Sequence, residues 1–249
     1  MSSPWKTLNR RINQREMIVE SLPQIRNAIP QLSAVRSCAM LGCGRGYIDL
    51  EFVRGCLPSV ERLAAVDPEA DPLDELATRV GQLLPNVSST EFHQETFQSW
   101  KVGDHRFDAV TLFHCLYYIP KPERFALFQK LFDNVVASGG LVFVLIAPYD
   151  IKNCTAFDRL KFRIFGESAI VDGIQVSDMM TSVGFCECYQ LKIKSQVSMT
   201  KPYDDWVALF THVSEGVRSC EEFSEMVNEL VGSEETIPYE NWLGVFKKP

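Results

Sequence analysis

Three glycines at alternate positions, Gly42, Gly44 and Gly46, follow an apolar run at 38–41 and precede a helix-like pattern at 47–53. Glycine adopts positive φ angles and lets a ligand approach the backbone without a side chain in the way. A strand, a glycine turn and a helix together present backbone N–H groups to a ligand at the helix N-terminus. An ordinary tight turn is the alternative, but three glycines so close together favour a ligand-binding turn.

The spacing of these glycines indicates which ligand the turn accepts. A dinucleotide-binding turn has the pattern Gly-x-Gly-x-x-Gly, whereas here the third glycine comes one residue early and Tyr47 stands in the last glycine position. A phosphate-binding loop requires Gly-Lys-Ser/Thr, which this turn lacks. We therefore expect a nucleoside ligand that has no pyrophosphate.

A carboxylate, Asp67, ends the next apolar run at 63–66 and precedes Pro68. In doubly wound folds an acidic residue at the end of the second strand accepts hydrogen bonds from ribose hydroxyls. An Asp-Pro turn is the alternative interpretation. The position of Asp67, one β-α-β unit after the glycines, favours a role in ligand binding.

The elements that must position these residues alternate between apolar runs and helix-like segments, which is typical of a parallel sheet. We expect an α/β fold, with a Rossmann-like, doubly wound and mostly parallel sheet that has an antiparallel edge. Ser177 is the expected N-cap of a short helix that ends at Gly184, and 138–140 is an expected turn. The other expected helices and strands lie at 4–28, 107–114, 122–136, 140–144, 155–166, 185–194, 204–217 and 242–246.

The length of 249 residues fits one domain with a sizeable core. We expect a single domain over 1–249. Its three parts are an N-terminal helical cover at 1–30, a cofactor-binding core at 37–148, and substrate-side helices and closing strands at 149–249.

The composition limits the classes of partner that the protein is expected to bind. A net charge of −7 without a long basic cluster argues against a nucleic-acid substrate and, more weakly, against an anionic membrane surface. The eight cysteines contain no Cys-x-x-Cys pair, and His93, His105 and His212 have no metal-ligand spacing, so we expect no metal. The N-terminus is polar and no apolar run is long enough to span a membrane. We therefore expect a cytoplasmic monomer that acts on a small molecule.

Taken together, the segment 41–46 and Asp67 resemble the motifs of the class I S-adenosylmethionine-dependent methyltransferases. The segments 107–114 and 138–144 are similar to the fourth and fifth strands of that family. The resemblance implies S-adenosylmethionine as cofactor and S-adenosylhomocysteine as its product. It also implies that the glycine turn and Asp67 hold the cofactor.

Two further segments, 92–96 and 113–118, resemble the histamine N-methyltransferase branch, with weaker similarity at 177–189 and 241–246. This resemblance implies N-methylation of a small amine, imidazole or amino-acid-like molecule. It places the substrate beside four residues: His114, Tyr117, Tyr118 and Asn241. It places the cofactor beside Gly42, Gly44, Gly46, Asp67, Glu95, Thr96 and Phe113.

The chain departs from the pattern of this branch in its N-terminal segment. The glutamate with which the branch binds a cationic substrate falls near Arg10, and the aromatic lid is reduced mainly to Trp5. A glutamine after the second strand is replaced near Pro72. Since guanidinium pairs with carboxylate in a bidentate geometry, an Arg10 that faces the pocket would suit a substrate bearing a carboxylate.

Methyl transfer from a sulfonium is an in-line displacement, so the protein mainly aligns the reactants and excludes water. An attacking amine must be neutral, and His114 is the best candidate to accept a proton because imidazole titrates near neutral pH. Tyr117, also a catalytic candidate, and Tyr118 offer aromatic faces to a cation. A purely structural histidine and plain core packing of the tyrosines are the alternatives.

Other functions remain open on the sequence alone. A small-molecule O-methyltransferase would share the whole cofactor half of the site. A non-catalytic methyltransferase-like binding subunit would have no reason to retain the glycines at 42–46 and Asp67. A nicotinamide-dependent oxidoreductase is disfavoured by the glycine spacing.

Overall fold

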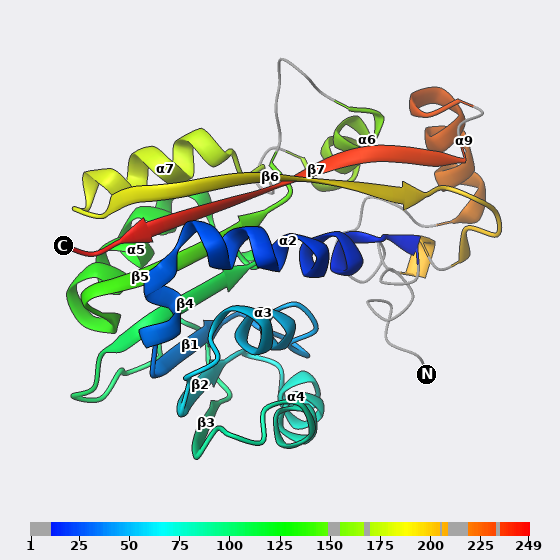
Figure 1. Cartoon of the computed structure of the whole chain (residues 1–249). Helices are drawn as coiled ribbons and strands as arrows, with labels where there is room; N and C mark the ends of the chain where they lie inside the picture. Colours follow the sequence, from blue (N-terminus) through cyan, green and yellow to red (C-terminus); the bar gives the residue numbers. More distant parts are fainter. Residues whose placement is uncertain (1–10, 149–154, 167–169, 205, 209–218, 233–234) are drawn as a thin grey trace.

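The computed structural model describes residues 11–148, 155–166, 170–204, 206–208, 219–232 and 235–249. Its centre is a seven-stranded sheet with the order β3-β2-β1-β4-β5-β7-β6 (Figure 1). Strands β1 to β5 are parallel, while β7 is antiparallel to both β5 and β6. The expected mostly parallel sheet with an antiparallel edge is confirmed. The strands are β1 (Ser37–Leu41), β2 (Arg62–Val66), β3 (Ser89–His93), β4 (Phe107–Phe113), β5 (Val136–Ile146), β6 (Cys186–Ser198) and β7 (Thr236–Lys247).

Helices cover both faces of the sheet. One face packs against α2 (Gln14–Ala28), α3 (Asp49–Cys56) and α4 (Ala70–Leu83), and the other against α5 (Arg124–Lys130) and α7 (Gly173–Ser182). Successive side chains of a strand point to opposite faces. On β1, Cys38 and Met40 therefore join the first layer, while Ala39 and Leu41 join the second.

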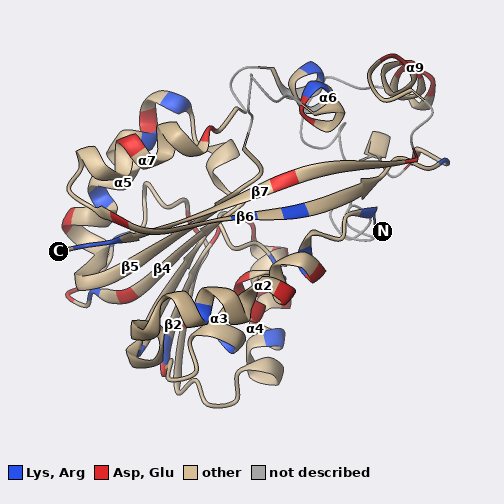
Figure 2. Ribbon diagram, turned by 45° about the horizontal axis from the view of Figure 1, so that its top comes forward, with Lys and Arg blue, Asp and Glu red and all other residues tan. Residues whose placement is uncertain are grey.

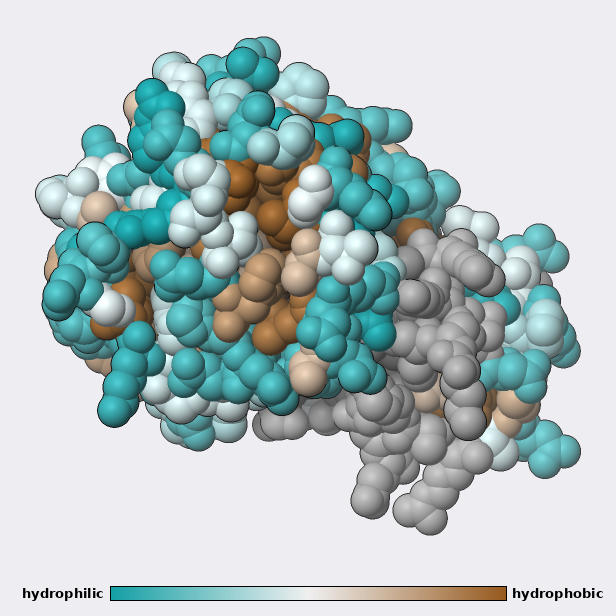
Figure 3. Space-filling model, turned by 90° about the horizontal axis from the view of Figure 1, so that it is seen from below, coloured by the Kyte–Doolittle hydropathy of each residue, from teal (hydrophilic) through white to brown (hydrophobic). Residues whose placement is uncertain are grey.

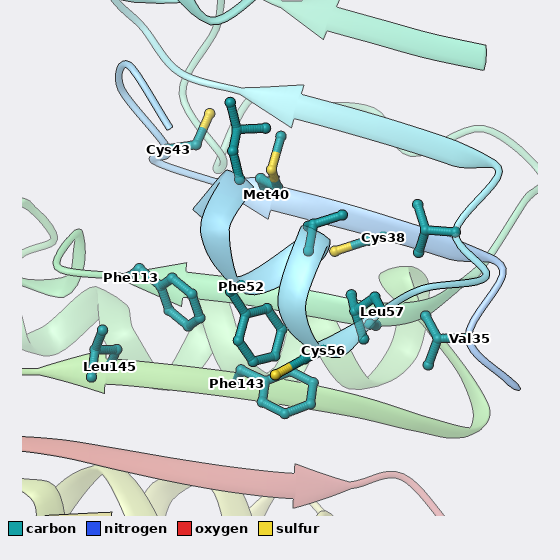
Figure 4. Close-up of a cluster of buried hydrophobic side chains, with 14 of the residues drawn as sticks. Val35, Cys38, Met40, Cys43, Phe52, Cys56, Leu57, Phe113, Phe143 and Leu145 are labelled. Atoms are coloured by element: carbon teal, nitrogen blue, oxygen red, sulfur yellow. The ribbon is translucent and has the colours of Figure 1, made fainter. Parts of the chain in front are cut away.

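The helix α3 is fixed by aromatic packing in the first layer (Figure 4). The ring of Phe52 lies edge-on to Phe113 at 5.3 Å and against Phe143 at 4.7 Å between centroids. Cys38 and Cys56 fill the space beside it as small buried thiols. Because α3 starts three residues after the glycine turn, this packing also fixes the turn.

The long paired strands β6 and β7 extend beyond the parallel strands and carry a third hydrophobic cluster (Figure 1). The cluster contains residues of α6 (Ala156–Phe165) and α9 (Cys220–Leu230). Within α6, Phe157 is buried there and Phe162 is 40% exposed. Most of the helix expected at 204–217 lies outside the described residues.

Several expected boundaries were wrong. The helix expected from Ser177 starts at Gly173, because the Asp172 side chain accepts from Ile174 N and so caps it. The helix expected at 122–136 is divided into a 3-10 turn at Lys121–Glu123, α5 and a π-helix at Leu131–Val135. The turn expected at 138–140 lies within β5.

The first residues of the helix expected at 4–28, residues 4–10, lie outside the described residues. Helix α2 starts at Gln14, and residues 12 and 13 pair with the end of β6 through an antiparallel bridge between Ile12 and Val197. A short 3-10 helix, Pro30–Ala34, links α2 to β1, and two more of these turns are Leu116–Tyr118 and Lys121–Glu123.

Hydrophilic side chains cover most of the face seen from below, with apolar ones showing between them (Figure 3). Basic and acidic residues are interspersed along the described elements, and acidic ones gather on α9 (Figure 2). None of the described helices is both long and apolar enough to cross a membrane.

Candidate active site

The glycine turn connects the carboxyl end of β1 to α3. All three glycines have positive φ angles: 62° at Gly42, 50° at Gly44 and 63° at Gly46. The N–H of Gly42 continues the sheet by donating to Val66 O at 2.8 Å, and the N–H of Gly46 donates to Cys43 O at 2.8 Å. L-residues with side chains rarely adopt this backbone conformation, which explains why the turn needs glycine.

The space around the turn separates the roles of its glycines. A Cβ added at Gly42 would lie 2.5 Å from Cys115 Cβ, and one at Gly46 would lie 2.4 Å from Leu76 Cδ1. A Cβ added at Gly44 would meet nothing within 4 Å. Gly42 and Gly46 are therefore needed for packing, whereas Gly44 leaves its backbone open to a ligand.

Asp67 faces this open backbone from the end of β2. It is 8% exposed; its Oδ2 accepts from Gly44 N at 2.7 Å and its Oδ1 accepts from Glu69 N at 3.0 Å. Its own N–H donates to His93 O at 3.1 Å, which ties it to the end of β3. The structure thus brings together the glycines and the carboxylate that the sequence singled out.

Side chains of helix α4 bind the outer side of the turn through hydrogen bonds and an ion pair. Tyr47 Oη donates to Glu75 Oε1 at 2.8 Å, and Arg45 Nε lies 3.3 Å from Glu75 Oε2. Arg79 donates to Arg45 O at 2.6 Å and lies 4.2 Å above the ring of Tyr47. The tyrosine in the last position of the glycine pattern therefore anchors the turn to α4.

The remaining predicted cofactor residues surround the same edge of the sheet less directly. Glu95 Oε1 is 3.9 Å from His93 Nδ1. Thr96 is exposed, and its Oγ1 lies 3.0 Å from Ser99 Oγ. Phe113 is 6% exposed and supports α3 through Phe52. Direct cofactor contacts of Glu95, Thr96 and Phe113 stay predictions.

His114 follows β4 and has a strained backbone, with a φ of 54°, while its N–H donates to Leu145 O at 2.8 Å. Such conformations in a non-glycine residue are often found at functional sites. Its Nε2 is 2.5 Å from Gln14 Nε2, and its Nδ1 is 3.3 Å from Tyr117 Oη. Since the amide nitrogen is a donor, this network assigns a neutral imidazole that accepts at Nε2 and donates from Nδ1.

The network continues away from the parallel strands. Gln14 Nε2 also donates to Asn241 Oδ1 at 2.7 Å, and Asn241 Nδ2 donates to Ser195 Oγ at 2.9 Å. Tyr117 Oη accepts from Ala147 N, and burial is the main cause that raises the pKa of this phenol. We call these side chains the polar cluster: Gln14, His114, Tyr117, Ser195 and Asn241.

The polar cluster contains three of the residues predicted for the substrate side: His114, Tyr117 and Asn241. Tyr118 is 64% exposed, and Arg10 and Trp5 lie outside the described residues. No sequence pattern marks Gln14 or Ser195, since each is a single polar residue in a helix or strand.

A second buried carboxylate was also missed. Asp49, the first residue of α3, is 3% exposed and accepts from Thr111 Oγ1 at 2.6 Å. Burial raises the pKa of Asp49 to about 7, with a smaller increase from Asp67, while the Thr111 hydrogen bond lowers it. Within the described ranges, no group of three or more potential metal ligands comes together.

Residues 39–140 match a family profile described as a methyltransferase domain. No curated protein sequence matches the chain significantly.

Among solved structures, a protein from Bacillus halodurans C-125 assigned as a methyltransferase is 16% identical with a TM-score of 0.69, covering 93% of this chain and 98% of its own. The N-methyltransferase NodS from Bradyrhizobium japonicum WM9 is 13% identical with a TM-score of 0.59, covering 95% and 99%. Magnesium protoporphyrin IX methyltransferase from Synechocystis PCC 6803, solved with S-adenosylhomocysteine, is 10% identical with a TM-score of 0.56, covering 95% and 83%.

These likenesses show the fold, and the profile identifies the part of the chain that carries the glycine turn, Asp67 and His114. The chain thus has the Rossmann-like fold of the class I methyltransferases, and its residues 39–140 match the methyltransferase domain family.

Proposed function

We propose that this protein is an S-adenosylmethionine-dependent methyltransferase that transfers a methyl group to a nitrogen of a small molecule. The observation that carries the proposal is the contact between Gly44 N and Asp67 Oδ2 at the joined ends of β1 and β2. It sets an open backbone and a carboxylate side by side, where a ribose and a methionine moiety need a hydrogen-bond acceptor and a close approach.

The residues present fit this cofactor. Asp67 would accept from ribose hydroxyls, Gly44 would admit the methionine end, and Gly42 and Gly46 hold the turn in shape. Glu95, Thr96 and Phe113 are proposed to complete the cofactor side at the ends of β3 and β4. S-adenosylmethionine supplies an electrophilic methyl group when bound.

The polar cluster is the proposed acceptor side. His114 would receive the proton that the acceptor nitrogen loses. The substrate would replace Gln14 as the hydrogen-bond partner of His114 Nε2, or share that partner position with it. Tyr117 orients His114 from the other ring nitrogen, and Asn241 fixes Gln14. Tyr118, Arg10 and Trp5 are proposed to border the substrate.

The cluster also bears on the substrate class. Its five members are amides, hydroxyls and a neutral imidazole, so it offers hydrogen bonds rather than a fixed opposite charge. This favours an uncharged nitrogen, as in an imidazole or a neutral amine, held in a way that resembles the histamine N-methyltransferases. An amino-acid-like substrate would place its carboxylate toward Arg10.

We further propose that 1–249 act as one domain and as a cytoplasmic monomer, without a nucleic-acid or membrane partner. The interspersed charges of the described elements support this part of the proposal (Figure 2). Sedimentation of the purified protein tests the oligomeric state.

The test of the function is methyl incorporation from labelled S-adenosylmethionine into a panel of imidazoles, amines, amino acids and phenols. We expect a labelled imidazole or amine, with product mass and fragmentation locating the methyl on nitrogen. Label on a hydroxyl would instead establish an O-methyltransferase. Cofactor binding without turnover of any panel member would leave a binding subunit as the better account.

A further inference from the structure

A buried carboxylate begins the helix that follows the glycine turn and forms no ion pair among the described residues. Asp49 accepts one side-chain hydrogen bond, from Thr111 on β4. Its electrostatic neighbours are three thiols and a second carboxylate, placed on β1, in the turn, after β2 and after β4: Cys38, Cys43, Asp67 and Cys115.

None of these neighbours can neutralise Asp49. Burial raises the pKa of each of the three thiols, so they stay uncharged, and Asp67 is itself acidic. The basic residues nearest in sequence, Arg45 and Arg54, pair with Glu75 and Glu51 instead. A buried carboxylate without a counter-charge is costly, which is why ionisation of Asp49 is disfavoured in the free protein.

The methyl donor of the proposed function carries a positive charge, which the surroundings of Asp49 lack among the described residues. S-adenosylmethionine is a sulfonium cation, and S-adenosylhomocysteine is the same molecule without the methyl group and without that positive charge. Asp67 is already engaged by Gly44 and Glu69. Asp49 is the more deeply buried of the two carboxylates and forms no ion pair among the described residues.

We propose that Asp49 is the counter-charge for the sulfonium of the donor, and that it makes the site bind S-adenosylmethionine in preference to S-adenosylhomocysteine. The inference rests on the proposed function and adds a specificity-determining residue to it. When the methyl leaves, the positive charge is lost, Asp49 is again unbalanced, and the product is held less tightly. Transfer thus promotes release of the spent cofactor.

The preference depends on pH because only the ionised carboxylate attracts the cation. Burial raises the pKa of Asp49 to about 7 in the free protein, with a small further increase from Asp67, while the Thr111 hydroxyl and a backbone hydrogen bond lower it. Binding of a cation lowers that pKa, so affinity for the sulfonium rises with pH through this range. Affinity for the neutral thioether lacks this gain.

The experiment is calorimetric titration of the full chain with S-adenosylmethionine and with S-adenosylhomocysteine at pH 6 and pH 8. For the wild type we expect the ratio of the two dissociation constants to move about tenfold in favour of the donor between these pH values. In Asp49→Asn the amide oxygen still accepts from Thr111 but the charge is gone. We expect the ratio of dissociation constants in this variant to favour the donor less than in the wild type. Once the titration of the ligands themselves is subtracted, the ratio should change less than about twofold between pH 6 and pH 8.

Two more variants separate this role from a merely structural one. Thr111→Val removes the hydroxyl that favours ionised Asp49, so the pH midpoint of the preference should shift upward. Asp108→Asn, at the opposite end of β4, alters a carboxylate that accepts from Arg36 N and Ser37 N and should leave the ratio unchanged. Equal ratios in wild type and Asp49→Asn at both pH values would overturn the inference while the proposed function stands. If neither ligand binds the wild type, the proposed function itself fails.

Discussion

The backbone N–H of Gly44 donates to Asp67 Oδ2 over 2.7 Å, which joins the turn after β1 to the end of β2. Neither residue could do this alone: Gly44 needs a φ of 50° to point its N–H at the carboxylate, and Asp67 needs Glu69 N to hold its other oxygen. The pair fixes a carboxylate and a bare backbone at one edge of the sheet.

Gly44→Ala should separate binding from stability. The new Cβ has open space around it, so the free energy of unfolding should fall by only about 1–2 kcal/mol, from backbone strain. Affinity for S-adenosylhomocysteine should fall at least about tenfold, because the methyl group occupies the approach to the turn. Gly42→Ala and Gly46→Ala meet Cys115 and Leu76 and should lose more stability, about 1–3 kcal/mol from overpacking in addition to strain. Urea unfolding and calorimetry measure both effects. A Gly44→Ala protein that binds as the wild type does would contradict this assignment.

Asp67→Asn tests the acceptor role of the carboxylate. The amide keeps one oxygen but turns an NH₂ toward either Gly44 or Glu69, which leaves one N–H without an acceptor at a cost of about 1–3 kcal/mol. Affinity for the nucleoside should fall by about tenfold to a hundredfold, since ribose hydroxyls lose an ionised acceptor. Asp71→Asn, on the exposed first turn of α4, is the matched control and should bind normally.

Variants of two residues in the polar cluster should change different kinetic parameters. His114→Gln retains a hydrogen-bonding side chain but no base near neutral pH, so kcat should fall about 10²-fold or more with a smaller change in KM. Gln14→Ala removes the contacts to His114 and Asn241 and should mainly raise KM. Gln24→Ala, exposed on the same helix, is the control. Steady-state kinetics with a panel substrate decides; equal kcat in wild type and His114→Gln would leave His114 with a structural role only.

Asp49 predicts how stability depends on pH without any ligand. Its folded-state pKa of about 7 is above the ordinary carboxyl value of 3.8. The contribution of protonated Asp49 to the free energy of unfolding is therefore fully present below the ordinary value and is lost as pH rises through about 7. Asp49→Asn cannot ionise, so it should be more stable than the wild type at pH 8, by on the order of 3 kcal/mol. Urea unfolding should show this advantage shrinking at pH 5. A variant destabilised equally at both pH values would refute the buried, unbalanced carboxylate.

The parts of the site that the sequence predicts are those fixed by neighbours along the chain. The glycines and Asp67 each stand where an apolar run stops, so strand ends and turn geometry identify them without knowledge of the tertiary structure. The same holds for β1, β2 and β4, which are short apolar runs between helical segments, whereas β3 is largely polar and mostly exposed and has no such pattern. The match of the chain to the histamine N-methyltransferase branch stays a prediction.

The parts that the sequence misses depend on distant contacts. Gln14 and Asn241 are 227 positions apart and meet only because β7 lies beside β5 and residues 12–13 pair with β6. Asp49 has the pattern of an ordinary acidic residue in the first turn of a helix, and its burial depends on Thr111, 62 positions away.

The predicted start of helix α7 is wrong for a local reason. Ser177 and Asp172 are both good N-caps, and Gly173 made the true start resemble a loop. Ser177 instead donates to Glu187 from within the helix.

Titration of the purified chain with S-adenosylhomocysteine, beside Asp67→Ala, tests the central claim most directly. The account predicts one bound ligand per wild-type chain and affinity at least about tenfold weaker in the variant, because the carboxylate that meets Gly44 is gone. Absence of binding to the folded wild type, or equal affinity in Asp67→Ala, would contradict it.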